Sequence, residues 1–287
     1  MEFDISRILL SFFVGYFLSL SGSLSQITTQ NQISSPSTLG FDGIAVFAIL
    51  VTQFILTSLG LSIGIEKFSF IVFVFIFFSL YLLSRKLKNK NHIENKMDKV
   101  ILLGIGFNLF VGAIFSIVQF LFMSMNMSFP SGIWFGNFKY YETSTILLFL
   151  VTFLLCKFEL YKNSKNLRLI SVGVEFARGL GIDTLKSQKR FLLMSLFLTG
   201  LVISFFGVFS FLGLIFPHLL RLIPGFSRNM KRELLYGPYI TGAVLSGLDI
   251  LCYNFTFFGA EVPVGMVSSI LGSFLLILLL VKGQKSV

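Results

Sequence analysis

Charged residues, histidines and cysteines are all scarce in this sequence. Only 13% of its 287 residues are charged, whereas a typical soluble domain has about 25%. Two cysteines cannot build a disulfide framework, and two histidines are too few for a histidine-rich metal site. Because 55% of the residues are hydrophobic and no polar stretch is long enough for a separate catalytic domain, the composition indicates an integral membrane protein.

The positive charges are distributed as in a membrane protein. The formal net charge of +10 fits either a nucleic-acid surface or the cytoplasmic loops of a membrane protein. Lysines and arginines lie between long apolar runs and form no stripe interleaved with aromatic residues. This pattern favours cytoplasmic loops, and we expect no nucleic-acid partner.

Apolar runs bounded by charges or turn residues predict about nine membrane-spanning helices, since about 20 apolar residues cross a bilayer. The run near Pro217 is short, and we expect it to be broken and buried inside the bundle. The predicted fold class is therefore all-α, a polytopic transmembrane bundle forming a single domain over 1–287. The predicted spans lie near 5–26, 41–60, 67–84, 100–124, 143–158, 190–207, 209–223, 234–257 and 264–281.

The orientation of these helices follows from the loop charges. If the amino terminus is outside and the carboxyl terminus is cytoplasmic, all but three of the 23 lysines and arginines lie on the cytoplasmic side. The exceptions are Arg7, Lys67 and Lys139. The positive-inside rule supports this orientation, with 157–190 as the longest cytoplasmic connection of a multi-pass protein in the cytoplasmic (inner) membrane.

Few ionisable residues lie at membrane depth. Asp249 is inside the eighth predicted span, Asp42 is near the start of the second and Glu261 is at the mouth of the ninth. Carriers coupled to protons or sodium usually need several such carboxylates. The sequence contains no GxSxG, paired-aspartate or HExxH pattern, so we predict that the protein is not an enzyme and that its energy source is elsewhere.

The connection 157–190 contains an amphipathic stretch at 169–182. Its apolar knob, flanked by Glu175 and Arg178, suits insertion into a groove on a soluble partner. The same stretch is also compatible with a position on the lipid surface.

Further motifs precede and follow this stretch in a fixed order. The motifs lie at 21–26, 31–40, 133–136, 169–182, 207–221 and 261–265, followed by Gly272. Together they closely resemble the membrane permease subunits of type II ABC importers, the FecCD family that takes up iron-siderophores, haem and cobalamin. The resemblance covers about 5–281, nearly the whole chain.

The resemblance implies the partners. It implies a two-fold dimer with a second permease, two ATPase subunits on the cytoplasmic face, and a soluble or lipid-anchored substrate-binding protein outside. The permease itself would bind no cofactor, and ATP and Mg would belong to the ATPase. The loop that couples to the ATPase would comprise Gly173, Glu175, Arg178, Gly179, Leu180 and Gly181.

The resemblance also assigns individual residues. It implies a cytoplasmic constriction formed by Asn31 and Ile33 facing Met97 and Asp98, with binding-protein docking at Arg7 and Glu261. We expect no metal ligand, because a single histidine beside a helix-breaking proline is more often structural. The remaining motif residues, with structural roles, are Gly207, Gly213, Pro217, His218, Arg221, Asp249, Pro263, Gly265 and Gly272.

The chain departs from the family pattern at several points. Family members usually have ten spans, and this chain begins at a segment resembling their second helix, so we expect either a truncated start or a nine-span variant. Gln32 stands where a proline is usual. Asp4 and Tyr253 stand where the family usually has external arginines that meet carboxylates on the binding protein, so we expect docking to be weaker or differently charged.

The favoured function is therefore an ABC importer permease for an iron-siderophore or a related metal chelate such as haem or cobalamin. Two other functions stay open. One is an ion-gradient-coupled secondary transporter that acts without an ATPase, and the other is a structural or assembly subunit with a closed pathway.

Overall fold

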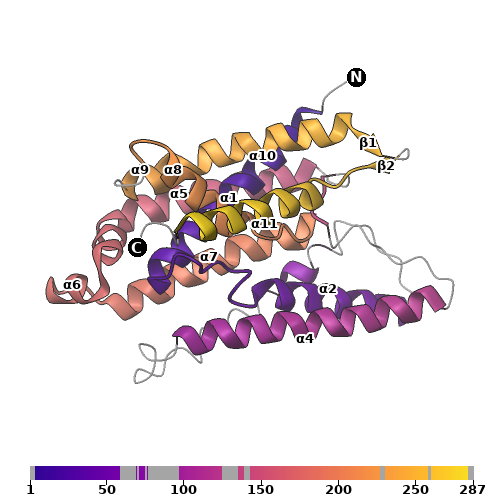
Figure 1. Ribbon diagram of the computed structural model, residues 1–287, viewed down its shortest axis with the longest axis horizontal. Helices are drawn as coiled ribbons and strands as arrows, with labels where there is room; N and C mark the ends of the chain where they lie inside the picture. Colours follow the sequence, from indigo (N-terminus) through magenta and orange to yellow (C-terminus); the bar gives the residue numbers. More distant parts are fainter. Residues whose placement is uncertain are drawn as a thin grey trace.

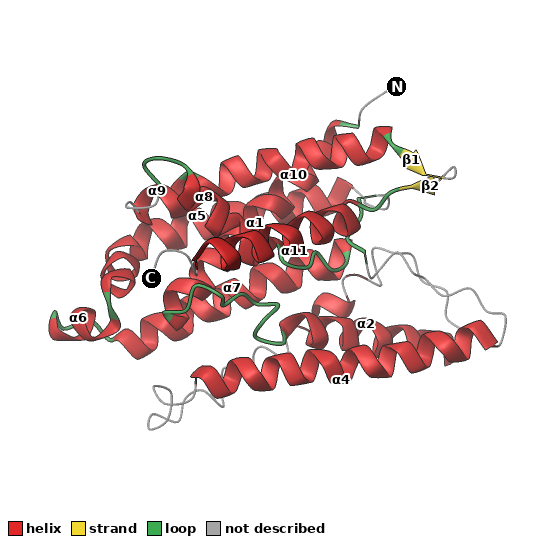
Figure 2. Ribbon diagram, in the orientation of Figure 1, coloured by secondary structure: helices red, strands yellow, loops and turns green. Residues whose placement is uncertain are grey.

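Helices make up almost all of the chain in the computed structural model (Figure 1). The structure describes residues 4–58, 69, 71–74, 76, 97–124, 135–138, 143–226, 230–257 and 260–283. Within these residues the strands are confined to one short antiparallel hairpin of β1 with β2 (Figure 2). The predicted all-α fold class is confirmed. The elements are α1 (Ile5–Thr29), α2 (Phe41–Ser58), α4 (Met97–Ser124), α5 (Thr143–Val172), α6 (Val174–Gly179), α7 (Thr184–Phe206), α8 (Leu212–Leu222), α9 (Met230–Leu235), α10 (Gly237–Asn254), β1 (Thr256–Phe257), β2 (Ala260–Glu261) and α11 (Val264–Gly283).

Most predicted spans correspond to helices that start within a few residues of the expected position. Three differ in extent. The span expected at 190–207 already begins at Thr184, as α7. The span expected at 143–158 continues as α5 to Val172, and the span expected at 234–257 is divided into α9 and α10 near Tyr236. The span expected at 67–84 lies mostly outside the described residues.

Three described helices, α1, α5 and α7, are long and apolar enough to cross a membrane. Shorter apolar stretches lie in α2, α4, α8 and α11. The described residues therefore support a polytopic membrane protein, and the number of nine spans stays a prediction.

Helix α1 passes through the middle of the bundle, surrounded by α10, α7, α8 and α5 (Figure 1). Its side chains are buried from Leu10 to Thr29 with the exception of Phe12. The largest core cluster includes the fully buried rings of Phe17 of α1 and Phe149 of α5. Such rings bury a large apolar area and hold the helices at fixed separations.

Helix α1 is also rich in buried hydroxyl groups, several of which bond within the helix. Ser11 donates to the carbonyl of Ile8 (3.0 Å) and Ser21 to that of Leu18 (2.9 Å). Thr28 donates to the carbonyl of Leu24 (2.8 Å) one turn earlier. These small polar side chains satisfy their hydrogen bonds locally and let neighbouring helices approach closely.

Helices α2 and α4 lie side by side in a second layer (Figure 1), which packs against the first mainly through α7. Phe41 and Ile49 of α2 are buried in one cluster with Leu196 and Ile203 of α7. The α2–α4 pair therefore has its own apolar contact surface beside the α1 bundle.

The two ends of the bundle carry different elements. The start of α1 and the β1–β2 hairpin lie at one end, whereas α6 and the end of α11 lie at the other (Figure 1). The predicted coupling residues and the carboxyl-terminal helix end are therefore on the same side of the molecule.

Candidate coupling surface and transport pathway

The connection between α5 and α7 is shorter than the sequence suggests. The predicted connection spans 157–190, but helix occupies both of its ends and leaves 173–183 between α5 and α7. Gly173 separates α5 from α6, and the carboxylate of Asp183 caps α7 by accepting the backbone N–H of Lys186 (3.0 Å). The short helix α6 is therefore set at a corner between two long helices.

A capped turn fixes the end of α6. The N–H of Gly181 donates to the carbonyl of Arg178 (2.9 Å), and the N–H of Ile182 donates to that of Ala177 (3.2 Å). These two bonds form a Schellman cap, which places the residue after the helix end in a left-handed conformation. Gly181 has φ 80°, which glycine adopts without steric cost. Gly179, the last residue of α6, faces open space.

Helix α6 exposes an apolar pair beside an ion pair. The side chains of Phe176 and Leu180 are 54% and 57% exposed, whereas Ala177 is fully buried. Arg178 Nη1 lies 3.3 Å from Glu175 Oε1, and both side chains are exposed. An apolar pair on a short helix anchored by its opposite face is suited to a groove on a soluble protein. The geometry thus fits the knob expected from the sequence.

The predicted constriction residues lie at helix ends. Asn31 follows α1 and its Oδ1 accepts the backbone N–H of Ile33 (2.9 Å), which is an Asx-turn. Ile33 is 54% exposed. Met97 and Asp98 are the first residues of α4, and the facing of the two pairs stays a prediction.

Helix α8 contains Pro217 and packs closely on α1. Since proline has no N–H, the carbonyl of Gly213 four residues earlier lacks its helical donor. That carbonyl faces Gly22, where any side chain would collide with it. His218 Nδ1 lies 2.8 Å from the carbonyl oxygen of Leu214, an arrangement that suits a structural residue. Within the described ranges no group of three or more His, Cys, Asp or Glu could hold a metal ion.

Arg221, near the end of α8, has a carboxylate partner that the sequence analysis missed. Arg221 Nε donates to Glu233 Oε2 (3.0 Å) and Nη2 to Oε1 (2.7 Å), in the bidentate geometry of a strong ion pair. Ser23 of α1 donates to the same carboxylate (3.3 Å). Glu233 is buried, so this cluster ties α8, α9 and α1 together.

Three of the motifs converge at the end of the bundle near the β1–β2 hairpin. Gly207 ends α7 with φ 83°. Beside it, the N–H of Gly136 donates to the carbonyl of Val208 (2.9 Å), and the N–H of Gly265 donates to that of Gly136 (2.7 Å). The small residues allow backbone to touch backbone here. The other part of the mid-chain motif, 133–134, lies outside the described residues.

Two further motif residues belong to the start and the middle of α11. Pro263 directly precedes Val264, the first residue of the helix, where its missing N–H leaves no helical bond unmade. Gly272 faces α8, and a Cβ there would lie 2.6 Å from Ile215 Cδ1 and 3.2 Å from Phe211 Cβ. Both positions are compatible with the structural roles that the resemblance implies.

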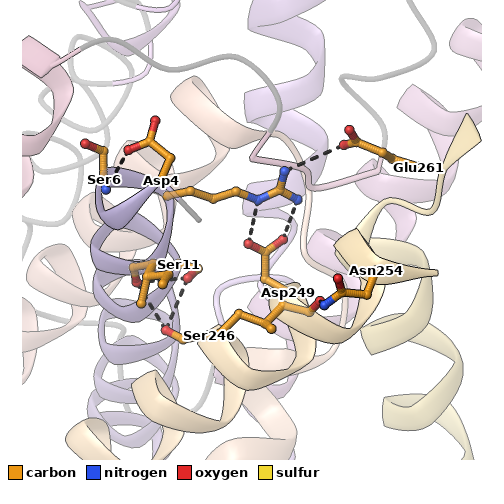
Figure 3. Close-up of polar contacts among 10 residues, drawn as sticks. Asp4, Ser6, Ser11, Ser246, Asp249, Asn254 and Glu261 are labelled. Carbon is orange, nitrogen blue, oxygen red and sulfur yellow. Dashed lines mark hydrogen bonds and ion pairs between the residues drawn. The ribbon is translucent and has the colours of Figure 1, made fainter. Parts of the chain in front are cut away.

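Arg7 and Glu261, the predicted docking residues, lie at the other end of the bundle from α6, where Arg7 contacts both Glu261 and Asp249. Arg7 Nε lies 2.8 Å from Asp249 Oδ2 and Arg7 Nη2 lies 2.9 Å from Oδ1. Glu261 Oε2 is 3.6 Å from Arg7 Nη1, so the two carboxylates point toward one guanidinium (Figure 3). The guanidinium also lies 4.7 Å from the ring centre of Tyr253. Arg7 is therefore engaged inside the protein.

These features define the class of protein. Long apolar helices form a polytopic bundle, broken helices and glycine contacts lie inside it, and an exposed apolar helix stands at one end. No catalytic constellation is needed to explain any of them. The class that these features fit is a polytopic membrane permease.

The chain belongs to the FecCD transport family, whose profile matches residues 1–282. It is 31% identical to the iron(3+)-hydroxamate import system permease protein FhuG of Bacillus subtilis, over 99% of this chain and 83% of that protein. It is 29% identical to the hemin transport system permease protein HmuU of Yersinia pestis, over 100% of this chain and 84% of that protein. The prediction of a membrane permease subunit of an ATP-binding cassette importer is confirmed.

Solved structures show the same fold. An inward-facing conformation of a metal-chelate type ABC transporter has a TM-score of 0.77 and 24% sequence identity, over 97% of this chain and 85% of that chain. PsaBC from Streptococcus pneumoniae in complex with Fab has a TM-score of 0.53 and 15% identity, over 96% and 90%. At these identities the likeness concerns the fold alone.

Proposed function

We propose that this permease carries an iron-siderophore, or a related metal chelate such as haem or cobalamin, into the cytoplasm. Two lines support this substrate class. The chain is 31% identical to a permease named for iron(3+)-hydroxamate import and 29% identical to one named for hemin transport. The motifs of the family also occur in order along the sequence.

In this proposal the energy comes from a separate ATPase that grips α6. The exposed pair of Phe176 and Leu180, anchored through Ala177, is the observation that carries the assignment. An anchored apolar knob buries area in a partner groove without needing to be ordered first, which favours binding. ATP and Mg belong to the ATPase, and the permease binds no cofactor itself.

The rest of the assembly follows the family pattern. A second permease, identical or different, completes a two-fold pathway, and a soluble or lipid-anchored binding protein delivers the substrate from outside. ATP binding draws the α6 segments of the two permeases together and alternates the exposure of the pathway to the two sides of the membrane. The constriction at Asn31 and Ile33 is the part of this chain that we expect to open and close.

Docking of the binding protein involves the end of the bundle that carries Glu261. Because Arg7 is held by Asp249 and Tyr253, its charge is not free to meet a partner carboxylate. Glu261 is the more exposed member of the cluster, at 36%. We therefore expect the binding protein to present a basic residue here, the reverse of the usual charge arrangement.

The experiment is copurification of the ATPase with the double variant Glu175→Ala/Arg178→Ala. We expect the ATPase to be lost while membrane insertion is unchanged. Phe176→Ala and Leu180→Ala should each weaken association by about tenfold, because truncating a central apolar contact removes a large share of the binding energy.

A matched control removes a different ion pair at the same end of the molecule. Arg190 of α7 pairs with Glu159 of α5, and Glu159→Ala/Arg190→Ala should leave copurification intact. Full ATPase recovery with the α6 double variant would overturn the docking assignment. Uptake that needs an ion gradient but no ATPase would overturn the whole proposal.

A further inference from the structure

Three amide side chains hold the segment between α1 and α2 to helices on both sides of it. This segment, 30–40, contains Asn31 and Ile33 of the predicted constriction. The amides belong to Gln30, Gln188 and Asn108, which come from three parts of the chain.

Two of the amides connect the end of α1 to the corner that carries α6. Gln30 Nε2 donates to the carbonyl of Ile170 in the last turn of α5 (2.9 Å), and also to that of Ile27 in its own helix (2.8 Å). Gln188 Nε2 of α7 donates to the carbonyl of Thr28 (2.8 Å). The two bonds run in opposite directions, so each side of the contact supplies one donor and one backbone acceptor.

The backbone of Gln30 is also fixed. It has φ 52° and ψ 28°, a left-handed conformation in a residue other than glycine, and its N–H closes the end of α1. Such a conformation costs free energy and is kept only where several surrounding contacts hold it in place. The bond to Ile170 is one of those contacts. Gln30, which makes it, directly precedes Asn31 in the sequence.

The third amide connects the far end of the segment to α4. Asn108 Nδ2 donates to the carbonyl of Ser37 (2.6 Å), and Asn108 Oδ1 accepts the N–H of Gly43 at the start of α2 (2.6 Å). Between the two attachments, Ser34 shares a buried hydrogen bond with the hydroxyl group of Ser25 in α1 (3.0 Å). The segment is thus held at its start by α5 and, through the end of α1, by α7. At its far end it is held by α4.

A clamp of this kind transmits displacement. The acceptors are backbone carbonyls of α5 and α1, so a shift of either helix end must break the bonds or carry the segment with it. All of these bonds are at least partly buried, where water competes less for the donors. A movement applied to α6 therefore reaches Ile33 without passing through the centre of the bundle.

From this geometry we infer that Gln30, Gln188 and Asn108 are positioning residues. They make the constriction move together with the connection 173–183 that carries α6. The inference rests on the proposed function, because it assigns the path by which the ATPase acts on the pathway. It adds a role for the amides that neither the family motifs nor the relatives' names supply.

The test uses the transporter assembled with its ATPase and the reactivity of a single thiol at Ile33→Cys. In the parent chain the reaction rate with a small maleimide should differ between the nucleotide-free state and the state with ATP and Mg. Gln30→Asn keeps a residue that tolerates the left-handed conformation but shortens the amide. Gln188→Leu keeps the size but removes the donor, and Gln188→Glu keeps the length and cannot donate when ionised.

These variants should reduce the ATP-dependent change in thiol reactivity by about fivefold, the equilibrium effect of losing one hydrogen bond, while ATP hydrolysis continues. Asn163→Ala is the matched control, because that amide bonds only within α5 in the contacts described, and it should behave as the parent. A transporter in which no ATPase assembles would overturn the proposed function. ATP hydrolysis with the same thiol response in parent and variants, or with no response in the parent, would overturn the clamp.

Discussion

At the scale of single residues, the pair of Arg7 and Asp249 shows how this protein keeps charges inside a membrane bundle. The exposed fraction is 17% for the Arg7 side chain and 3% for that of Asp249. Both guanidinium donors of the pair have a carboxylate oxygen within 2.9 Å. A charge at this depth is tolerated because its partner is present, and removing one partner leaves the other buried and unpaired.

We predict that Asp249→Asn lowers stability by roughly 3 kcal/mol, because it leaves the Arg7 guanidinium without its main counter-charge. The melting temperature in detergent measures the effect. Replacing both partners with apolar residues, as in Arg7→Met/Asp249→Leu, should recover most of the loss.

Glu261→Gln provides the control for this pair. Its carboxylate is more exposed and lies 3.6 Å from Arg7, so we expect a loss of less than about 1 kcal/mol. An equal fall in melting temperature for Asp249→Asn and Glu261→Gln would contradict the assignment of Asp249 as the main partner.

The residue scale also marks a limit of sequence reasoning. The sequence marks Asp249 as a deep carboxylate and Arg7 as an external cation, but they are 242 positions apart. It marks Arg221 as a motif residue and gives no sign of its partner Glu233. A pairing between distant helices depends on how the bundle closes, which no local pattern encodes.

At the scale of elements, the contact of α1 with α8 depends on two glycines. Gly22 faces the carbonyl of Gly213, and a side chain at Gly22 would overlap with that oxygen. The carbonyl is available because Pro217 cannot donate to it. The broken helix expected from the sequence is therefore also a packing surface.

Gly22→Ala should separate α1 from α8 and lower the stability of the bundle by about 2 kcal/mol, a typical cost of overpacking. The yield of monodisperse protein and its melting temperature test this expectation. Gly106→Ala in α4 is the matched control, since a Cβ there meets nothing within 4 Å, and alanine favours the helix by up to about 1 kcal/mol. Equal behaviour of the two variants would show that the glycine contact is unimportant.

Helix ends show which part of an element the sequence could predict. The starts of α1, α2 and α11 match the first apolar residues after turn signals. The end of α5 does not match the end of its apolar run, because 157–172 contains neither glycine nor proline and the helix continues to Gly173. Hydrophobicity predicts where a helix can leave the bilayer, whereas a backbone signal decides where it stops.

At the scale of the whole molecule, the two ends of the bundle are chemically distinct. One end carries the ion cluster of Arg7, and the other carries α6 with its apolar knob. The distribution of positive charge predicts that the α6 end is cytoplasmic, which stays a prediction. The direction in which the bundle sits in the membrane follows from the same rule and can be tested directly.

Single thiols at the two ends should report opposite sides of the membrane. In sealed cells we expect Phe255→Cys to react with an impermeant maleimide, and Leu180→Cys to react only after permeabilisation. Both native residues are exposed, at 70% and 57%, and the native Cys156 and Cys252 are buried, so background labelling should be low. Reaction of Leu180→Cys in sealed cells would reverse the orientation and remove the ATPase assignment.

The hydroxyl bonds within α1 bear on how the protein is made. The chain leaves the ribosome in order, so α1 reaches lipid well before the helices that finally surround it. The hydroxyl groups of Ser11, Ser21 and Thr28 already have acceptors one turn back, so these bonds can be made in the bilayer before the neighbouring helices arrive. The carboxylate that pairs with Arg7, that of Asp249, follows 242 residues later, so we expect the guanidinium to stay at the water boundary until then. Insertion of α1 and closure of the bundle around it are thus separate steps of biogenesis, and charge neutralisation completes the second.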